Sequence, residues 1–131
     1  DVLKKKKFNK NYEIIGDFDL MLDISKTLKF ACVQKPLAFY RIHSDNQSIK
    51  KFDLEKRELE NWIKIEKKNF DNFSINGVLD RIQTLNIKID ISSGKRISAL
   101  KKIFRLKNNT KKIKFFFSLL IPSKILNFLI S

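Results

Sequence analysis

The stretch that most constrains the fold runs from residue 53 to residue 70, DLEKRELENWIKIEKKNF. It is rich in residues with high helix propensity. Leu59, Trp62 and Ile63 recur at helical spacing, and Glu66 falls on the same side. Acids and bases such as Glu58 and Lys64 are expected to cover the remaining surface. The spacing therefore predicts an amphipathic helix over residues 53–70.

Three other segments carry helical patterns. Residues 17–29 place apolar side chains at i, i+3 and i+4 intervals, and residues 75–87 share an apolar face. The sequence KRISALKKIFRL predicts a short basic helix, which the SSG at residues 92–94 separates from the preceding one. Helices are thus expected along most of the second half of the chain.

Two short strands are expected before the long helix. Residues 30–34, FACVQ, are apolar and bounded by polar residues, and residues 37–43 follow Pro36, which bars entry into a helix. SDNQS, at residues 44–48, is rich in turn and cap formers. The order helix, strand, strand, loop is typical of an α/β or α+β fold. We predict the α/β class, followed by a mainly α-helical C-terminal extension.

Composition allows one modest domain, because 43% of the 131 residues are hydrophobic. The chain opens with Asp1 and without a charged-then-apolar signal segment, so we expect a processed or partial chain. The single cysteine, Cys32, excludes an internal disulfide and a multi-cysteine zinc site. It lies in an apolar run, and we expect it to be buried and chemically idle.

The net charge of +14 is concentrated in the tail. Up to Asp90 the chain has 18 bases and 14 acids, whereas residues 91–131 hold ten bases and no acid. A basic chain can bind nucleic acid by releasing counterions from phosphates, so a small nucleic-acid-binding protein is one alternative function. No helix-turn-helix, zinc-finger or RNP-type pattern supports that alternative.

The last segment, residues 108–131, combines lysines with apolar residues. Its apolar stretch of 16 residues, from Phe115 to Ile130, is interrupted by Pro122, Lys124 and Asn127, whereas about 20 apolar residues are needed to span a bilayer. Such a helix suits the plane of a membrane interface, although its apolar residues could equally pack back onto the domain. The candidate membrane residues are Lys111, Lys112, Lys114, Phe115, Phe116 and Phe117. A membrane-surface scaffolding protein is therefore a second alternative function.

Three acids stand in the otherwise apolar stretch EIIGDFDLMLDI, residues 13–24. Next to Gly16, where a helix is expected to begin, Asp17 or Asp19 could cap exposed backbone N–H groups and meet the positive end of the helix dipole. Capping alone would account for these acids without any catalytic role.

Two ordered motifs suggest chemistry instead. FNKNYEIIGDFDLMLDIS and, downstream of it, KPLAFYRIHSDNQS resemble the C-terminal half of the catalytic domain of inverting family-2-type glycosyltransferases with the GT-A fold. The match covers residues 8–48 well and the later helices only by general character. The resemblance implies that residues 1–48 are the acceptor-side part of such a domain. We expect residues 49–107 to form a helical extension and residues 108–131 a basic amphipathic, membrane-proximal helix.

The resemblance implies that Asp17 is the general base, which takes the proton from a sugar hydroxyl as that hydroxyl attacks the anomeric carbon. Attack opposite the departing nucleoside diphosphate inverts the anomeric centre. Asp19 matches the second acid of the motif, with an orienting or capping role on the acceptor side. Gly16 stands where many members have Glu, so the base assignment depends on Asp17 alone.

The second motif implies the donor side of the site. Arg41 would offset phosphate charge, and His43 would lie near the donor diphosphate or its divalent metal, Mg²⁺ or Mn²⁺. In isolation, His43 fits a satisfied histidine at a strand end. Tyr40 fits a half-buried strand residue on the acceptor side.

The implied function is transfer of a sugar from a nucleotide-sugar donor to a polysaccharide or lipid-linked acceptor. It would take place in the cytoplasm, at the inner face of an anionic membrane, and we expect no nucleic-acid partner. No βαβ unit or Asp-x-Asp-type metal motif precedes Asp17, so we expect the isolated chain to lack activity.

Overall fold

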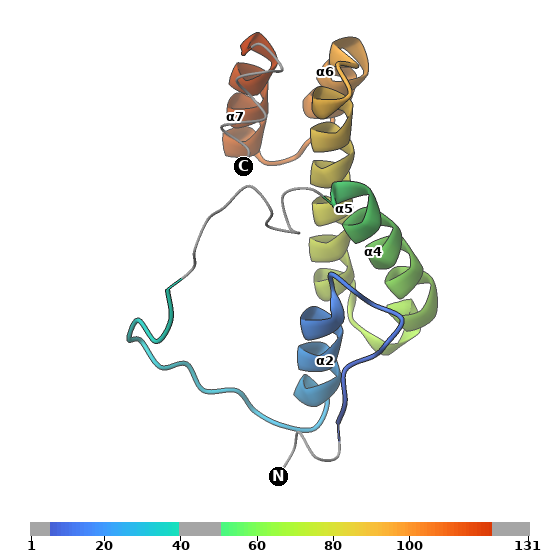
Figure 1. Cartoon of the computed structure of the whole chain (residues 1–131), viewed down its shortest axis with the longest axis vertical. Coiled ribbons are helices and arrows are strands. Elements are labelled where there is room, and N and C mark those ends of the chain that lie inside the picture. Colours follow the sequence, from blue (N-terminus) through green and yellow to red (C-terminus); the bar gives the residue numbers. More distant parts are fainter. Residues whose placement is uncertain (1–5, 40–50, 122–131) are drawn as a thin grey trace.

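The computed structural model describes residues 6–39 and 51–121. The longest helix, α5, runs along the long axis of the molecule, with α4 beside one half of it and α6 and α7 at the other end (Figure 1). The elements in chain order are α2 (Gly16–Ser25), α4 (Phe52–Glu66), the short 3₁₀ helix η1 (Lys67–Asn69), α5 (Asn72–Ser92), α6 (Arg96–Phe104) and α7 (Asn109–Leu120). The helices predicted from the apolar spacing are therefore confirmed, although α2 and α4 each end four residues earlier than predicted, at Ser25 and Glu66.

The predicted α/β fold class is wrong, because residues 6–39 and 51–121 contain no strand. Residues 30–34 have no regular secondary structure, and neither do residues 37–39; the rest of the second predicted strand, residues 40–43, lies outside the described residues. A strand exists only where its backbone groups pair with those of a neighbour. No second extended segment lies beside residues 30–34 within the described part of the chain.

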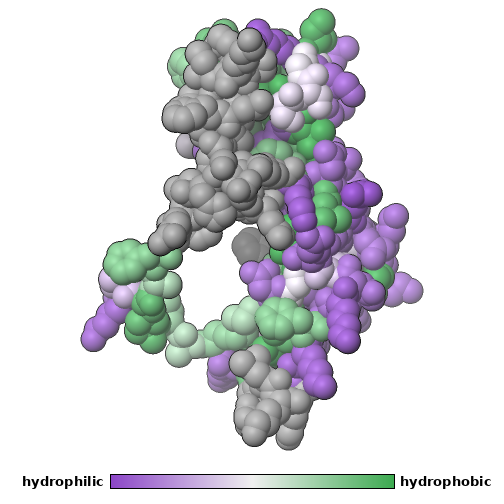
Figure 2. Space-filling model, viewed as in Figure 1, coloured by the Kyte–Doolittle hydropathy of each residue, from purple (hydrophilic) through white to green (hydrophobic). Residues whose placement is uncertain are grey.

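The segment after α2 consequently keeps its apolar side chains in solvent. Phe30, Val33 and Leu37 are all exposed, and so is Cys32, which contradicts the prediction of a buried cysteine. In Figure 2 the hydrophobic side chains of this segment lie on the left, away from the helices. Without a sheet to cover them, these residues have no core to enter.

The core consists of two hydrophobic clusters that share α5. The first joins α2, α4 and the beginning of α5 around Trp62, which is 1% exposed and packs edge-on against Phe18 with ring centroids 5.3 Å apart. The second joins the end of α5 to α6 and α7 around Ile87 and Phe115. Helix α5 is longer than predicted because its apolar residues serve both clusters in turn.

The turn between α5 and α6 is fixed by backbone hydrogen bonds. The N–H of Lys95 donates to the carbonyl of Asp90 at 2.8 Å, and the N–H of Gly94 donates to that of Ile91 at 3.0 Å. This is the Schellman arrangement, which needs a residue in the left-handed region after the helix, and Gly94 has a φ of 72°. The predicted break at residues 92–94 therefore sets the position of α6.

Candidate functional site

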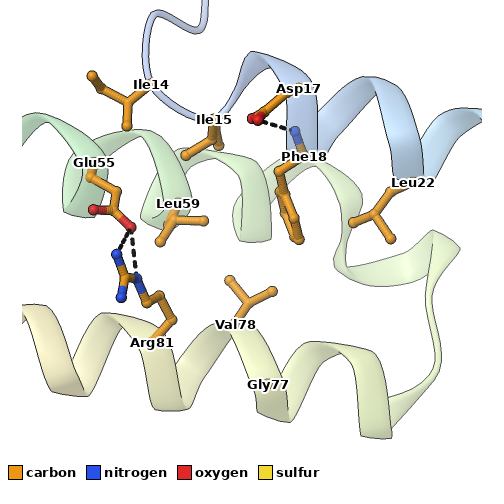
Figure 3. Close-up of a pocket in the computed structure, with 10 residues that line it drawn as sticks. All are labelled: Ile14, Ile15, Asp17, Phe18, Leu22, Glu55, Leu59, Gly77, Val78 and Arg81. Atoms are coloured by element: carbon orange, nitrogen blue, oxygen red, sulfur yellow. Dashed lines mark hydrogen bonds and ion pairs between the residues drawn. The ribbon is translucent and has the colours of Figure 1, made fainter. Parts of the chain in front are cut away.

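Asp17 lies at the second position of α2, with its side chain exposed. One carboxylate oxygen, Oδ1, accepts a hydrogen bond of 2.7 Å from the backbone N–H of the next residue, Phe18. Asp17 also borders a groove of about 440 Å³ between α2, α4 and α5 (Figure 3). The carboxylate is therefore accessible to a ligand that enters this groove.

The groove is mainly apolar. Its walls are formed by Ile14, Ile15, Phe18, Leu22, Leu59 and Val78, together with Asp17, Glu55, Gly77 and Arg81. Gly77 contributes no side chain, and a Cβ added there would meet no atom within 4 Å. Most specific small-molecule sites combine such an apolar lining with a few polar groups.

The two other charged residues of the groove neutralise each other. Oε1 of Glu55 accepts a hydrogen bond of 2.7 Å from Nε of Arg81 and lies 2.6 Å from an Arg81 terminal nitrogen (Figure 3). Glu55 is only 7% exposed, so this pair links α4 to α5 across the groove wall. Asp17 is therefore the one acid among the groove residues that has no ion pair within the described part of the chain.

The backbone just before α2 is capped by a different acid, Glu58 on α4. Its Oε1 accepts from the N–H of Glu13 at 2.8 Å, and its Oε2 accepts from those of Ile14 and Ile15 at 2.9 and 3.1 Å. The sequence placed Glu58 on the solvent side of its helix, but it is 7% exposed. The only hint in the sequence was an acid next to Leu59 and four residues before Trp62, on the buried side.

The side chain of Asp19 is held by a hydrogen bond from a core residue. Its Oδ1 accepts a hydrogen bond of 2.9 Å from the indole Nε1–H of Trp62, which joins α2 to α4. Because Trp62 is almost fully buried, this bond holds the first turn of α2 in place. The two acids at the start of α2 thus differ in environment, because Asp17 is exposed and Asp19 accepts a hydrogen bond from the buried Trp62.

A smaller pocket of about 150 Å³ lies on the other side of α2, where Tyr12, Asp19, Trp62 and Glu66 meet. Burial, and then the negative charges of Asp19, Glu66 and Glu58, raise the pKa of Tyr12. The phenol therefore stays protonated near neutral pH and can donate a hydrogen bond there.

The predicted donor-side residues Arg41 and His43 lie outside the described residues, and so does Tyr40, which was predicted as an acceptor-side or structural residue. Within residues 6–39 and 51–121, no three His, Cys, Asp or Glu side chains come together in a way that could hold a metal ion. The Mg²⁺ or Mn²⁺ ion and the role of His43 stay predictions.

The candidate membrane residues divide between two faces of α7. Phe115 is 6% exposed and belongs to the second core cluster, whereas Phe116 and Phe117 are exposed. Lys111 forms an ion pair with Asp80 on α5. Lys112 is half-buried and Lys114 is exposed, and neither has an ion pair among the described residues. In that same part of the chain, no helix has the length and apolar character needed to cross a membrane.

Comparison of the chain with protein-family models, with curated proteins and with solved structures finds no match.

Proposed function

We propose that this chain forms the acceptor-side part of an inverting glycosyltransferase of the family-2 type, with Asp17 as its general base. The donor is a nucleotide-sugar, and the acceptor is a glycan or a lipid-linked sugar. The proposal starts from the two sequence motifs. The observation that carries it further is that Asp17 is exposed at the edge of a groove, while Glu58 accepts the backbone N–H groups that precede α2.

Glu58 and Asp17 accept different backbone N–H groups near the start of α2. Glu58 accepts those of Glu13, Ile14 and Ile15, which precede the helix, whereas Asp17 accepts that of Phe18, which lies in its first turn. This capping bond uses one carboxylate oxygen of Asp17, and the other accepts no hydrogen bond from the described residues. A carboxylate with open accepting positions beside a groove is what a general base requires.

Asp19 has a positioning role in this proposal. Its bond to Trp62 anchors the first turn of α2 and thereby fixes the carboxylate two residues earlier. The reaction step assigned to Asp17 is acceptance of the proton from an acceptor hydroxyl. The hydroxyl oxygen forms the new bond to the anomeric carbon as the bond to the nucleoside diphosphate breaks.

The groove supports the proposed acceptor. Its volume of about 440 Å³ falls within the range of small-molecule sites, roughly 300–1,000 Å³. The lining by Ile14, Leu22, Leu59 and Val78 favours an acceptor with an apolar portion, such as a sugar joined to a lipid. An acceptor hydroxyl at the edge of the groove would then meet Asp17.

The test compares Asp17→Asn with Asp19→Asn in the enzyme that carries this segment together with a nucleotide-binding half. Asp17→Asn keeps the size of the side chain but removes the base, so transfer should fall by at least about 10²-fold with little change in donor affinity. Asp19→Asn is the matched control, because its amide oxygen can still accept from Trp62. Equal losses in the two variants, or transfer near the wild-type rate in Asp17→Asn, would contradict the proposal.

A second variant tests the groove itself. Gly77→Leu should narrow the groove, because Gly77 lines it and a Cβ at this helical position meets no atom within 4 Å. We expect a KM for the acceptor raised by about tenfold or more, because the leucine side chain takes space that the acceptor would fill, with the donor affinity unchanged. An unchanged acceptor KM would remove the groove from the proposal.

A further inference from the structure

The helices α6 and α7 form a hairpin at the end of the molecule opposite α2 (Figure 1). Six of its apolar side chains point away from the core and are between 47% and 75% exposed: Ile97, Phe104, Ile113, Phe116, Phe117 and Leu120. We call them the hairpin apolar face. Four of them occupy positions i, i+3, i+4 and i+7 of α7 and so form one continuous stripe. A shallow groove of about 220 Å³ connects Phe104 of α6 with Phe116 and Phe117 of α7.

The fold does not need this face. The opposite side of α7 supplies Phe115 and Leu119 to the second core cluster, where they meet Ile103 and Leu106. Lys111, also on that side, reaches Asp80 of α5. Helix α7 therefore has one apolar side that holds it to the protein and another that the described part of the chain leaves uncovered.

All charged residues of the hairpin are basic. Residues 91–121 contain nine lysines and arginines and no acid. Two of these bases are neutralised by α5, since Lys102 lies 2.6 Å from Asp90 and Lys111 pairs with Asp80. The bases without an ion pair within the described residues include Lys101, Arg105, Lys107, Lys112 and Lys114.

Lysines border the apolar stripe of α7. At 3.6 residues per turn, Lys112 and Lys114 fall on opposite flanks of the stripe formed by Ile113, Phe116, Phe117 and Leu120. Lys112 also lines the groove beside Phe116 and Phe117. Apolar side chains bordered by unpaired cations are typical of helices that lie in the interface of an anionic bilayer.

We propose that the hairpin apolar face docks on an anionic lipid surface, with Phe116, Phe117 and Leu120 inserted among the acyl chains and the flanking lysines at the phosphate headgroups. Charge complementarity selects this occupant. A second copy of the hairpin would bring two acid-free basic surfaces together, which is unfavourable. Nucleic acid would satisfy the lysines but would leave the aliphatic side chains without an apolar partner. This docking surface does not depend on the proposed sugar transfer.

The experiment measures sedimentation of the full 131-residue chain with phosphatidylcholine vesicles that contain or lack phosphatidylglycerol. We expect binding only with the anionic lipid, and weaker binding as salt is added. The double variant Phe116→Ser, Phe117→Ser should lower the partition coefficient at least tenfold, through loss of inserted apolar area. Phe39→Ser is the matched control, because Phe39 is fully exposed but lies far along the chain from the hairpin, and it should leave binding unchanged.

The charge contribution has its own pair of variants. Lys112→Gln and Lys114→Gln should each lower binding to anionic vesicles about fivefold. Lys67→Gln and Lys68→Gln, at exposed positions in η1, change the net charge equally and should have a smaller effect. Circular dichroism checks that each variant is folded, as expected for changes at exposed positions.

Four results would overturn the proposal. They are equal binding to neutral and anionic vesicles, no binding to either, an effect of Phe39→Ser as large as that of the hairpin variant, and a dimer in sedimentation equilibrium that the Phe116→Ser, Phe117→Ser change dissociates. Retention on duplex DNA that the phenylalanine variant leaves intact, combined with no lipid binding, would assign the basic hairpin to nucleic acid instead.

Discussion

The three hydrogen bonds that Glu58 accepts make it the residue whose loss should most disturb the position of Asp17. Of the three donors, the N–H of Ile15 is buried, while those of Glu13 and Ile14 are partly buried and can be rehydrated. A buried donor left without an acceptor costs about 1–3 kcal/mol, and a bond to a charged group contributes about 1.5–3 kcal/mol. We therefore expect Glu58→Ala to lower the free energy of unfolding by about 3 kcal/mol.

Glu58→Gln should have a smaller effect. Its amide oxygen can keep the bonds to Ile14 and Ile15, but its NH₂ group would face the N–H of Glu13, so about 1 kcal/mol should be lost. Urea unfolding followed by circular dichroism measures both changes. Amide hydrogen exchange at Ile15 should accelerate in the alanine variant, because its N–H then has no acceptor.

Glu60→Ala is the matched control on the same helix. Glu60 makes only an i, i+4 ion pair of 3.6 Å with Lys56, and its side chain is 43% exposed, so the change should stay within about 0.5 kcal/mol. If Glu58→Ala costs no more than Glu60→Ala, the reasoning that Glu58 anchors the start of α2 is refuted.

Two further predictions concern the second half of the chain. Burial alone would raise the pKa of Asp90, but hydrogen bonds from Lys102 and Ser98 outweigh it and hold this pKa below its ordinary value of 3.8. Asp90 therefore stabilises the fold above about pH 4, and this contribution is lost as the pH falls through the folded-state pKa. In the Asp90→Asn variant the free energy of unfolding, measured by urea unfolding, should decrease less as the pH falls below 4. An acid dependence equal to that of the wild type would contradict this. Gly94→Ala should lower the free energy of unfolding by about 1 kcal/mol, because the φ of 72° is unfavourable for alanine, and a stabilised variant would show that the turn adapts.

The helices could be predicted because their signal is local. Leu59 and Trp62 follow the helical period within one segment, and both are buried in the structure. The same holds for Leu20 and Ile24 in α2. Periodicity of apolar side chains reports directly on which face a helix buries, whatever element covers it.

The strands could not be predicted in the same way, because pairing is not local. Residues 30–34 have the composition of a buried strand, but a strand forms only beside a partner, and the described residues provide none. The same missing neighbour explains why Cys32 is exposed. An apolar run fixes a preference for burial and leaves open what covers it.

The candidate site was predictable in part. The motif identified Asp17 and Asp19, and the structure distinguishes them by exposure and by the bond from Trp62. Glu58 could not be found from its own segment, because its partners are backbone groups more than forty residues away in the sequence. The difference in burial between Phe115 and Phe116 likewise depends on which side of α7 faces α5 and α6.

The central claim, that Asp17 accepts the proton of the acceptor hydroxyl, is tested most directly by chemical rescue of Asp17→Ala in the enzyme that contains a nucleotide-binding half. Because Asp17 is exposed at the edge of the groove, a small carboxylate such as formate can reach the space that its side chain leaves. We expect Asp17→Ala to reduce transfer by at least about 10²-fold and added formate to restore part of it in a concentration-dependent way, with inversion at the anomeric carbon. Transfer near the wild-type rate in Asp17→Ala, or a loss that formate does not relieve, would contradict the assignment of Asp17 as the base.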